Sequence, residues 1–106
     1  MARAKFQTLT EQMFYILLCM NEKRCGMDVM ELVREMTGGR IVIGAGTMYT
    51  LLADFEKAGI IQEVEVEGRK RSYLITEKGR EMLTKEYVRV KTQIKDYERI
   101  MEGERK

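Results

Sequence analysis

A cluster of basic side chains in the second half of the chain has the chemistry to bind an anion. Between Gly68 and Arg80 the sequence holds five basic residues against one acidic residue, Glu77. The five are Arg69, Lys70, Arg71, Lys78 and Arg80. The preceding segment, 54–67, has the opposite sign, with five acidic residues against one lysine. Since the formal net charge of the whole chain is only +2, this separation of signs, and not the total charge, predicts an anion-binding surface.

A second set of candidate contact residues lies in the segment 44–61, GAGTMYTLLADFEKAGII. At 100° per residue its large apolar side chains form one stripe of a helix. They are Met48, Leu51, Leu52 and Phe55. The remaining surface is small and hydroxylic, with Thr50 opposite the stripe and Thr47 and Tyr49 on its flanks. Such a face allows close approach to another surface, for example the major groove of DNA. An ordinary surface helix with small residues is the alternative, and this segment alone does not decide between them.

Side chains that would support catalysis or bind a metal are scarce. The sequence has no histidine, which removes the commonest general acid–base group, and no carboxylate stands alone in apolar surroundings. Cys19 and Cys25 lack the paired spacing of zinc ligands. The sequence therefore predicts no catalytic site, no metal and no cofactor. Cys19 lies in an apolar run and is expected in the core, whereas Cys25 lies at a helix junction, where it could be exposed, so a redox role stays open.

The length and composition are those of one soluble domain. The chain has 106 residues, of which 44% are hydrophobic and 34% charged, enough to bury a core but near the size at which partners often help. No apolar run approaches the roughly 20 residues of a membrane span. The N-terminus lacks the apolar region and cleavage site of a signal peptide. We therefore expect no membrane span and a cytoplasmic location.

The elements that must position these residues begin with two helices. Thr8 and Glu11 stand at capping-box spacing and predict a first helix that extends to about residue 22. A second helix is expected over 27–37, ended by the glycine pair 38–39.

A third helix and a hairpin follow. The β-branched run 41–43 is too short for a helix and predicts a brief strand. Thr47 would cap the third helix, and Gly59 would end it. Beyond Gly59 the pattern alternates, with valines on one face and glutamates on the other, then a turn at 68–70 and a returning strand. Thr76 would cap a last helix.

The last predicted helix is the longest element. From Glu77 to about Met101 there is no glycine except Gly79 near its start and no proline. Its apolar residues are spaced by four and three, as in a coiled-coil seam. They are Leu83, Tyr87, Val90, Ile94, Tyr97 and Met101. A helix of roughly 37 Å is longer than the small domain before it, so its distal half has no surface of its own chain to cover. We therefore predict dimerisation through this helix; packing of the helix back on its own domain is the alternative.

The order of elements predicts a mainly α (α+β) fold. A winged helix-turn-helix domain is expected over residues 1–76, and a long C-terminal dimerisation helix over 77–106. The hairpin would be the wing, packed on the helices because a lone hairpin is marginal in water. The strand expected at 41–43 would extend its sheet.

Over about residues 9–101 the chain resembles the short-form members of the PadR family of transcriptional regulators. The matching segments occur in the order and spacing of the family: Gly26-Met27-Asp28-Val29, Gly46-Thr47-Met48-Tyr49-Thr50-Leu51-Leu52, Phe55-Glu56-Lys57-Ala58-Gly59-Ile60-Ile61, and Arg69-Lys70-Arg71-Ser72-Tyr73-Leu74-Ile75-Thr76-Glu77-Lys78-Gly79. Each segment is a weak signal alone, but four in order are a strong one.

The resemblance implies a homodimeric repressor that places its third helix in the major groove of an inverted-repeat operator. The family's contacts carry over to Thr47 and Tyr49, and its basic wing to the run 69–71. Hydroxyl groups bind phosphate and fix register, and cations on a wing supply salt-dependent affinity. The N-terminal residues Arg3 and Lys5 could add a phosphate contact.

The sequence departs from the family at two places. Ala53-Asp54 replaces basic residues midway along the third helix, which predicts modest affinity or reliance on the wing. The tryptophan with which some short-form relatives bind aromatic drugs is absent, and Val90 stands at about its place. Tyr87, Val90 and Tyr97 either line a smaller site for a hydrophobic or aromatic effector or simply pack the seam. A winged-helix module that binds protein and not DNA is the alternative function.

Overall fold

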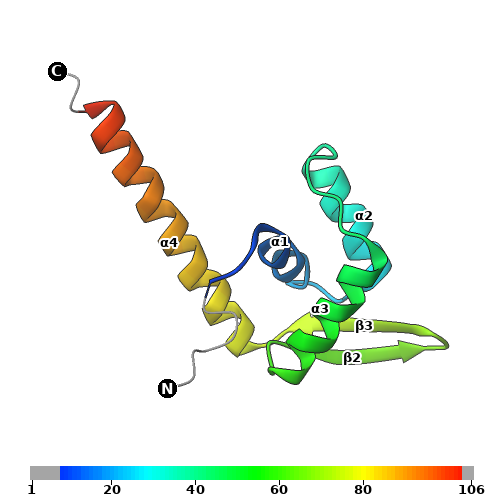
Figure 1. Ribbon diagram of the computed structural model, residues 1–106. Coiled ribbons are helices and arrows are strands. Elements are labelled where there is room, and N and C mark those ends of the chain that lie inside the picture. Colours follow the sequence, from blue (N-terminus) through cyan, green and yellow to red (C-terminus); the bar gives the residue numbers. More distant parts are fainter. Residues whose placement is uncertain (1–7, 104–106) are drawn as a thin grey trace.

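The computed structural model describes residues 8–103 as four helices and a three-stranded sheet (Figure 1). In chain order the elements are α1 (Glu11–Cys19), β1 (Arg24–Cys25), α2 (Gly26–Met36), α3 (Ala45–Lys57), β2 (Ile61–Glu67), β3 (Lys70–Ile75) and α4 (Glu77–Met101). This order is that of a winged helix-turn-helix, and the α+β class predicted from the sequence is confirmed. No helix within residues 8–103 is long and apolar enough to cross a membrane.

The start of α1 differs from the prediction. Thr10, not Thr8, is the N-cap, and its hydroxyl accepts a hydrogen bond from the Met13 amide at 3.2 Å. Glu11 is therefore the first helical residue and cannot complete a capping box, which needs a carboxylate three residues after the cap. The helix also ends at Cys19, earlier than predicted. The Met20 carbonyl accepts instead from the Ile75 amide at 2.8 Å, which ties the end of α1 to the sheet.

The prediction of a strand at 41–43 is wrong. The third strand is β1, which pairs antiparallel with β3 through Arg24↔Tyr73 and Cys25↔Ser72. The segment 41–43 forms no strand: Ile41 and Ile43 are buried in the core, while Val42 is 62% exposed. Two of its three β-branched side chains thus pack in the core, and the segment takes no part in strand pairing.

Helix α3 begins earlier than predicted and ends where predicted. Its N-cap is Gly44, so Thr47 is not the cap but lies in the first turn. Gly59 has φ +77° and closes the helix. The Gly59 amide donates to the Glu56 carbonyl at 3.0 Å and the Ile60 amide to the Phe55 carbonyl at 2.9 Å. This is a Schellman motif, with buried Phe55 and Ile60 as its apolar contact.

The sheet has the order β1-β3-β2, and β2 and β3 form the wing. Their register slips between Glu63 and Glu65, where β2 has a bulge. Val64 and Val66 are on the solvent side, 42% and 56% exposed, whereas Glu63 and Glu65 are half-buried. The predicted alternation is present, but the valines do not face the helices.

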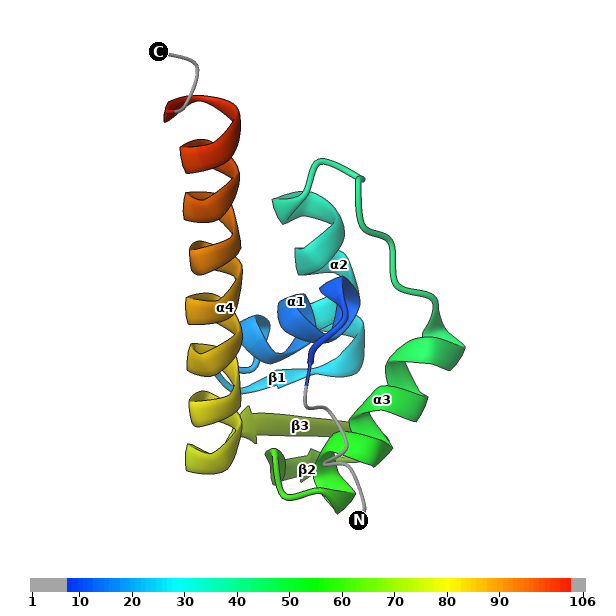
Figure 2. The same cartoon turned by 60° about the vertical axis from the view of Figure 1, so that its left-hand side comes forward.

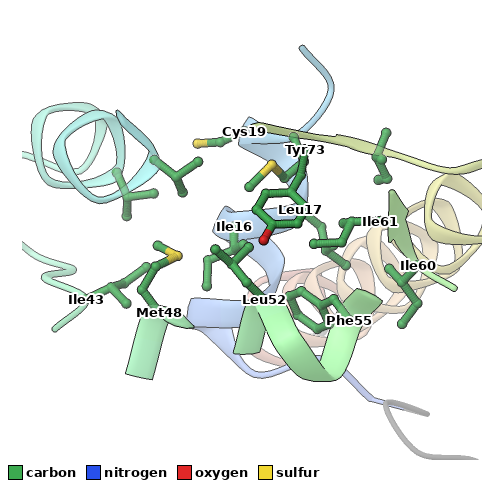
Figure 3. Close-up of a cluster of buried hydrophobic side chains, with 14 of the residues drawn as sticks. Ile16, Leu17, Cys19, Ile43, Met48, Leu52, Phe55, Ile60, Ile61 and Tyr73 are labelled. Atoms are coloured by element: carbon green, nitrogen blue, oxygen red, sulfur yellow. The ribbon is translucent and has the colours of Figure 1, made fainter. Parts of the chain in front are cut away.

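The core lies between the three N-terminal helices and the sheet (Figure 3). Phe55, Ile16 and Leu17 are among its fully buried side chains. The predicted burial of Cys19 is confirmed, at 4% exposed. Cys25 is buried too, at 8%, because its strand pairs with β3, so the suggestion that it could be exposed is wrong.

Helix α4 starts on the core and then leaves it. The Thr76 hydroxyl accepts from the Gly79 amide at 3.2 Å, which confirms the predicted N-cap. A Cβ at Gly79 would lie 2.4 Å from the Ile60 carbonyl oxygen, so glycine permits this close approach. The distal turns extend away from the other elements (Figure 1, Figure 2).

Candidate nucleic-acid interface

The packing of α3 fixes which of its side chains face outward. Met48, Leu52 and Phe55 are at most 2% exposed and lock the helix onto the core. A helix with this stripe buried must present the opposite face to solvent. Thr47 and Thr50 are accordingly exposed.

Tyr49 lies at the boundary between α3 and α2. Its side chain is 51% exposed. A Cβ built at Gly26, the first residue of α2, would lie 3.0 Å from Tyr49 Cε1 and 3.2 Å from Leu52 Cδ1. The Tyr49 ring therefore rests on the α2 backbone at a position without a side chain. This role of Gly26 was not predicted: in the sequence the residue stood out only as the first of a segment that resembles the family.

The wing carries three of the five basic residues of the cluster. Arg69, Lys70 and Arg71 are all exposed at the start of β3 and in the turn before it. Arg71 Nε lies 3.4 Å from Glu63 Oε2, so its charge is partly balanced within the wing. Arg69 and Lys70 form no ion pair within residues 8–103. Lys70 lies near enough to Glu65 to help lower the pKa of that carboxyl, but neither cation is held in an ion pair, so both can bind an anion.

The other two basic residues of the cluster have structural partners. Lys78 Nζ donates to the Ala58 carbonyl at 2.8 Å, at the C-terminal end of α3, where a cation suits the helix dipole. Arg80 Nη1 donates to Asn21 Oδ1 at 2.7 Å. The sequence cluster of five is thus divided between the wing and the start of α4.

Two acidic side chains of the wing, Glu63 and Glu65, have ion-pair partners as well. Lys23, before β1, forms an ion pair with Glu65 of β2. This hydrogen-bonded pair raises the pKa of Lys23 and lowers the pKa of Glu65. The acidic segment of the sequence is therefore partly neutralised in the fold.

A hollow of about 620 Å³ separates α3 from the wing. It is lined by the start of α2, by the side of α3 that carries Tyr49 and Ala53, and by wing residues 69–71. The fold brings Tyr49 together with the wing cations here, while Thr47 and Thr50 lie outside the hollow. Glu56, one turn after Ala53 on α3, also lines the hollow. We did not predict an acidic side chain at this place, although a spacing of three residues puts Glu56 and Ala53 on the same side of the helix.

The predicted seam of α4 falls into two parts. Leu83 is half-buried and packs against the core of its own chain. The remaining five are exposed, with exposed fractions between 38% and 60%: Tyr87, Val90, Ile94, Tyr97 and Met101. Val88 and Ile100 are exposed too. The distal part of α4 thus presents uncovered apolar side chains.

A second hollow, of about 330 Å³, lies between α1 and α4. Phe14, Tyr15, Tyr87 and Val90 line it, but Tyr97 does not. Glu86 and Arg89 line it as well: the Glu86 carboxylate, 6% exposed, accepts from the Leu9 amide at 3.4 Å and pairs with Arg89.

The pKa of Glu86 is held below its usual value. The hydrogen bonds from Arg89 are the largest cause, and the one from the Leu9 amide adds to them; burial acts in the opposite direction. The carboxylate is therefore a charged link between α4 and the segment before α1.

The described part of the chain holds no group of three or more acidic, cysteine or histidine side chains that could bind a metal ion. Cys19 and Cys25 are both free thiols. Arg3 and Lys5 lie outside the described residues.

Comparison with known proteins adds a family match and structural neighbours. The model of the transcriptional regulator PadR-like family matches residues 16–85. No curated protein sequence matches significantly.

Three solved structures illustrate the likeness of fold. A transcriptional regulator from Clostridium thermocellum is 22% identical, with TM-score 0.70 and coverage of 88% of this chain and 91% of that one. A PadR family regulator from Eggerthella lenta is 18% identical, with TM-score 0.72 and coverage of 84% and 80%. A PadR-like transcription factor from Bacteroides fragilis is 22% identical, with TM-score 0.71 and coverage of 82% and 86%. At such identities these likenesses show the fold.

Proposed function

Since this chain belongs to the PadR-like family of transcriptional regulators, we propose that it is a homodimeric repressor that binds an inverted-repeat operator in double-stranded DNA. One observation carries the proposal: Tyr49, at the edge of the exposed hydroxyl face of α3, shares a hollow with the wing cations Arg69 and Lys70, which are free of ion pairs among the described residues. A hydroxylic helix next to free cations suits a groove flanked by phosphates.

The contacts divide by chemistry. Helix α3 enters the major groove, where the hydroxyls of Thr47 and Thr50 reach base edges or phosphates. Tyr49, seated on Gly26, donates its hydroxyl to the phosphate backbone. Arg69 and Lys70 bind phosphates beside the groove, and Arg71 contributes less because Glu63 partly balances its charge. Glu56 disfavours phosphate at the far end of α3, so affinity depends on the wing.

Dimerisation uses the apolar side chains of distal α4, since a long exposed apolar stripe needs a partner surface. A symmetric dimer places two α3 helices so that they read half-sites about one helical turn apart. Release by a small hydrophobic or aromatic effector uses the hollow between α1 and α4, because that hollow joins the DNA-binding domain to the dimerisation helix.

Fluorescence anisotropy of the full chain tests specific DNA binding. We expect tighter binding to a duplex from the gene's own upstream region than to the same duplex scrambled, at each of several salt concentrations. The competing function, a module that binds protein, predicts no DNA binding and a protein partner that co-purifies. Equal affinity for both duplexes at every salt concentration would contradict a specific regulator.

A further inference from the structure

We propose that the hollow between α2, α3 and the wing is a second ligand site, which takes a small planar aromatic monoanion. It shares no lining residue with the hollow between α1 and α4. Its volume of about 620 Å³ lies in the range of small-molecule sites. Bound there, the ligand excludes DNA from the same face; this second statement rests on the proposed function, whereas binding itself does not.

The helix side of the hollow carries uncovered apolar side chains. Met27, in the first turn of α2, is 68% exposed, and Tyr49 is 51% exposed; both line the hollow. The buried side chains of Leu52 and Tyr73 form its floor. A flat ring would cover the Met27 thioether and the Tyr49 ring together, since both groups make favourable contacts with aromatic faces.

The charged side chains that line the hollow favour an anionic ligand and determine how it is oriented. Arg69, Lys70 and Arg71 line the wing side, and two carboxylates, those of Asp28 and Glu56, line the helix side. Three lining cations against two lining carboxylates leave an excess of positive charge on the wing side, which Glu63 beside Arg71 reduces but does not remove from Arg69 and Lys70. The acidic group of the ligand therefore lies toward the free Arg69 and Lys70, and its ring toward the helices. A second negative charge on the ring would meet the two carboxylates.

Exclusion of DNA follows from shared residues. Tyr49, Arg69 and Lys70 contact the ligand here and phosphates in the proposed DNA complex. One set of side chains cannot serve both partners at once, so the two bind competitively.

Naphthalene-2-sulfonate is a suitable probe, because it is planar, aromatic and singly charged. The full chain, labelled with ¹³C in its methionine methyl groups, is titrated with the probe and followed by NMR. We expect the Met27 methyl signal to shift in a saturable manner, while the signal of Met101, on distal α4, stays in place. Neutral 2-naphthol should bind about twofold to fivefold more weakly, because the exposed cations add only a modest attraction; naphthalene-2,6-disulfonate should also bind more weakly.

Two variants on the same helix locate the site. Ala53 lines the hollow and Lys57 does not, and both are exposed. Ala53→Phe should fill the hollow and abolish the Met27 shift, whereas Lys57→Phe should keep it, with circular dichroism showing both variants folded. Arg69→Gln with Lys70→Gln should remove the preference for naphthalene-2-sulfonate over 2-naphthol. An unmoved Met27 signal, or equal probe binding by the two phenylalanine variants, overturns the site.

Competition is measured with the operator duplex. At ten times the dissociation constant of the probe, the apparent Kd for DNA should rise about elevenfold. An unchanged Kd despite a saturated Met27 shift overturns the exclusion of DNA. If the protein binds no specific duplex, the regulator proposal fails, while the probe titration still decides whether the hollow is a ligand site.

Discussion

At the residue scale, the candidate interface depends on which polar groups are free and which are already bound. Five basic residues are close in sequence, yet Lys78 and Arg80 hold the Ala58 carbonyl and the Asn21 side chain. Arg69 and Lys70 have no such partner among residues 8–103. A cation already bound inside the protein gains little from a phosphate, so the number of available charges is smaller than the sequence suggests.

Replacing the two free cations should change the salt dependence of DNA binding. For Arg69→Ala with Lys70→Ala, the slope of log K against log salt should become shallower by about two, because each phosphate contact releases about one counterion. Binding should weaken about equally for all duplexes. The matched control, Lys85→Ala with Lys95→Ala on exposed α4, should keep the slope. Anisotropy titrations at four salt concentrations measure it, and an unchanged slope removes the wing from the contacts.

The contact of Gly26 with Tyr49 gives a second prediction at this scale. Gly26→Ala places a methyl group 3.0 Å from Tyr49 Cε1, so the half-exposed ring must move outward. We expect DNA affinity to fall about twofold to tenfold, the effect of one hydrogen bond. Thermal stability should change little, because alanine also favours the helix.

A double-mutant cycle tests whether Gly26→Ala weakens DNA binding through Tyr49 or in another way. In a Tyr49→Ala background, Gly26→Ala should cause no further loss of DNA affinity. An equal loss in both backgrounds would show that Gly26 does not act through Tyr49.

At the element scale, short polar links set the position of α4 on the domain. Thr76 caps α4, and its own amide donates to the Ile60 carbonyl at 2.9 Å. Nearly three turns further along, Glu86 reaches the Leu9 amide, 77 positions away in sequence. The helix is thus held both at the wing and at the start of α1, which suits the proposed role of α4 in joining DNA binding to dimerisation.

The link through Glu86 predicts a pH dependence of stability. Because the pKa of Glu86 is lowered in the fold, its charged form stabilises the protein above the unfolded pKa. This contribution is lost as the pH falls through the folded pKa. Glu86→Gln keeps an acceptor for the Leu9 amide but not the charge that Arg89 binds. We expect this variant to be less stable than wild type at pH 7 and to lose less stability between pH 7 and pH 3.

Urea unfolding at several pH values measures the difference. Glu81→Gln, on an exposed part of the same helix, is the control and should follow wild type. Parallel curves for wild type and Glu86→Gln would contradict a stabilising role of the charge.

At the scale of the whole molecule, the elongated shape argues for a partner. The principal extents are 62 × 39 × 22 Å, and distal α4 accounts for the projection (Figure 1). Apolar side chains left uncovered on such a projection favour association with a second copy.

Dimerisation is therefore expected to depend on Ile94, which is 52% exposed. Ile94→Asp would place like charges in a symmetric interface, so the variant should sediment as a 12.4 kDa monomer, while wild type sediments at twice that mass. Gln93→Asp, at the adjacent exposed position, introduces the same charge and should remain dimeric. Analytical ultracentrifugation at tens of micromolar protein distinguishes the monomer from the dimer. A wild-type monomer would contradict the seam.

The sequence by itself determined the order of the four helices and the hairpin, the end of α3 at Gly59, the cap at Thr76 and the outward face of α3. These features depend on neighbouring residues: apolar periodicity sets which face is buried, and glycine or threonine sets where a helix ends. The N-terminal ends of α1 and α3 were predicted less well, because several nearby residues could act as the N-cap of each helix.

Only the tertiary structure decided which segments and side chains meet. It paired β3 with Arg24–Cys25 and not with 41–43, seated Tyr49 on Gly26, divided the basic cluster and formed the hollow beside the wing. Each of these depends on contacts between residues far apart in the chain, and no local periodicity encodes them. The physical reason is that burial and charge pairing are properties of the packed chain, whereas propensity and patterning are properties of its segments.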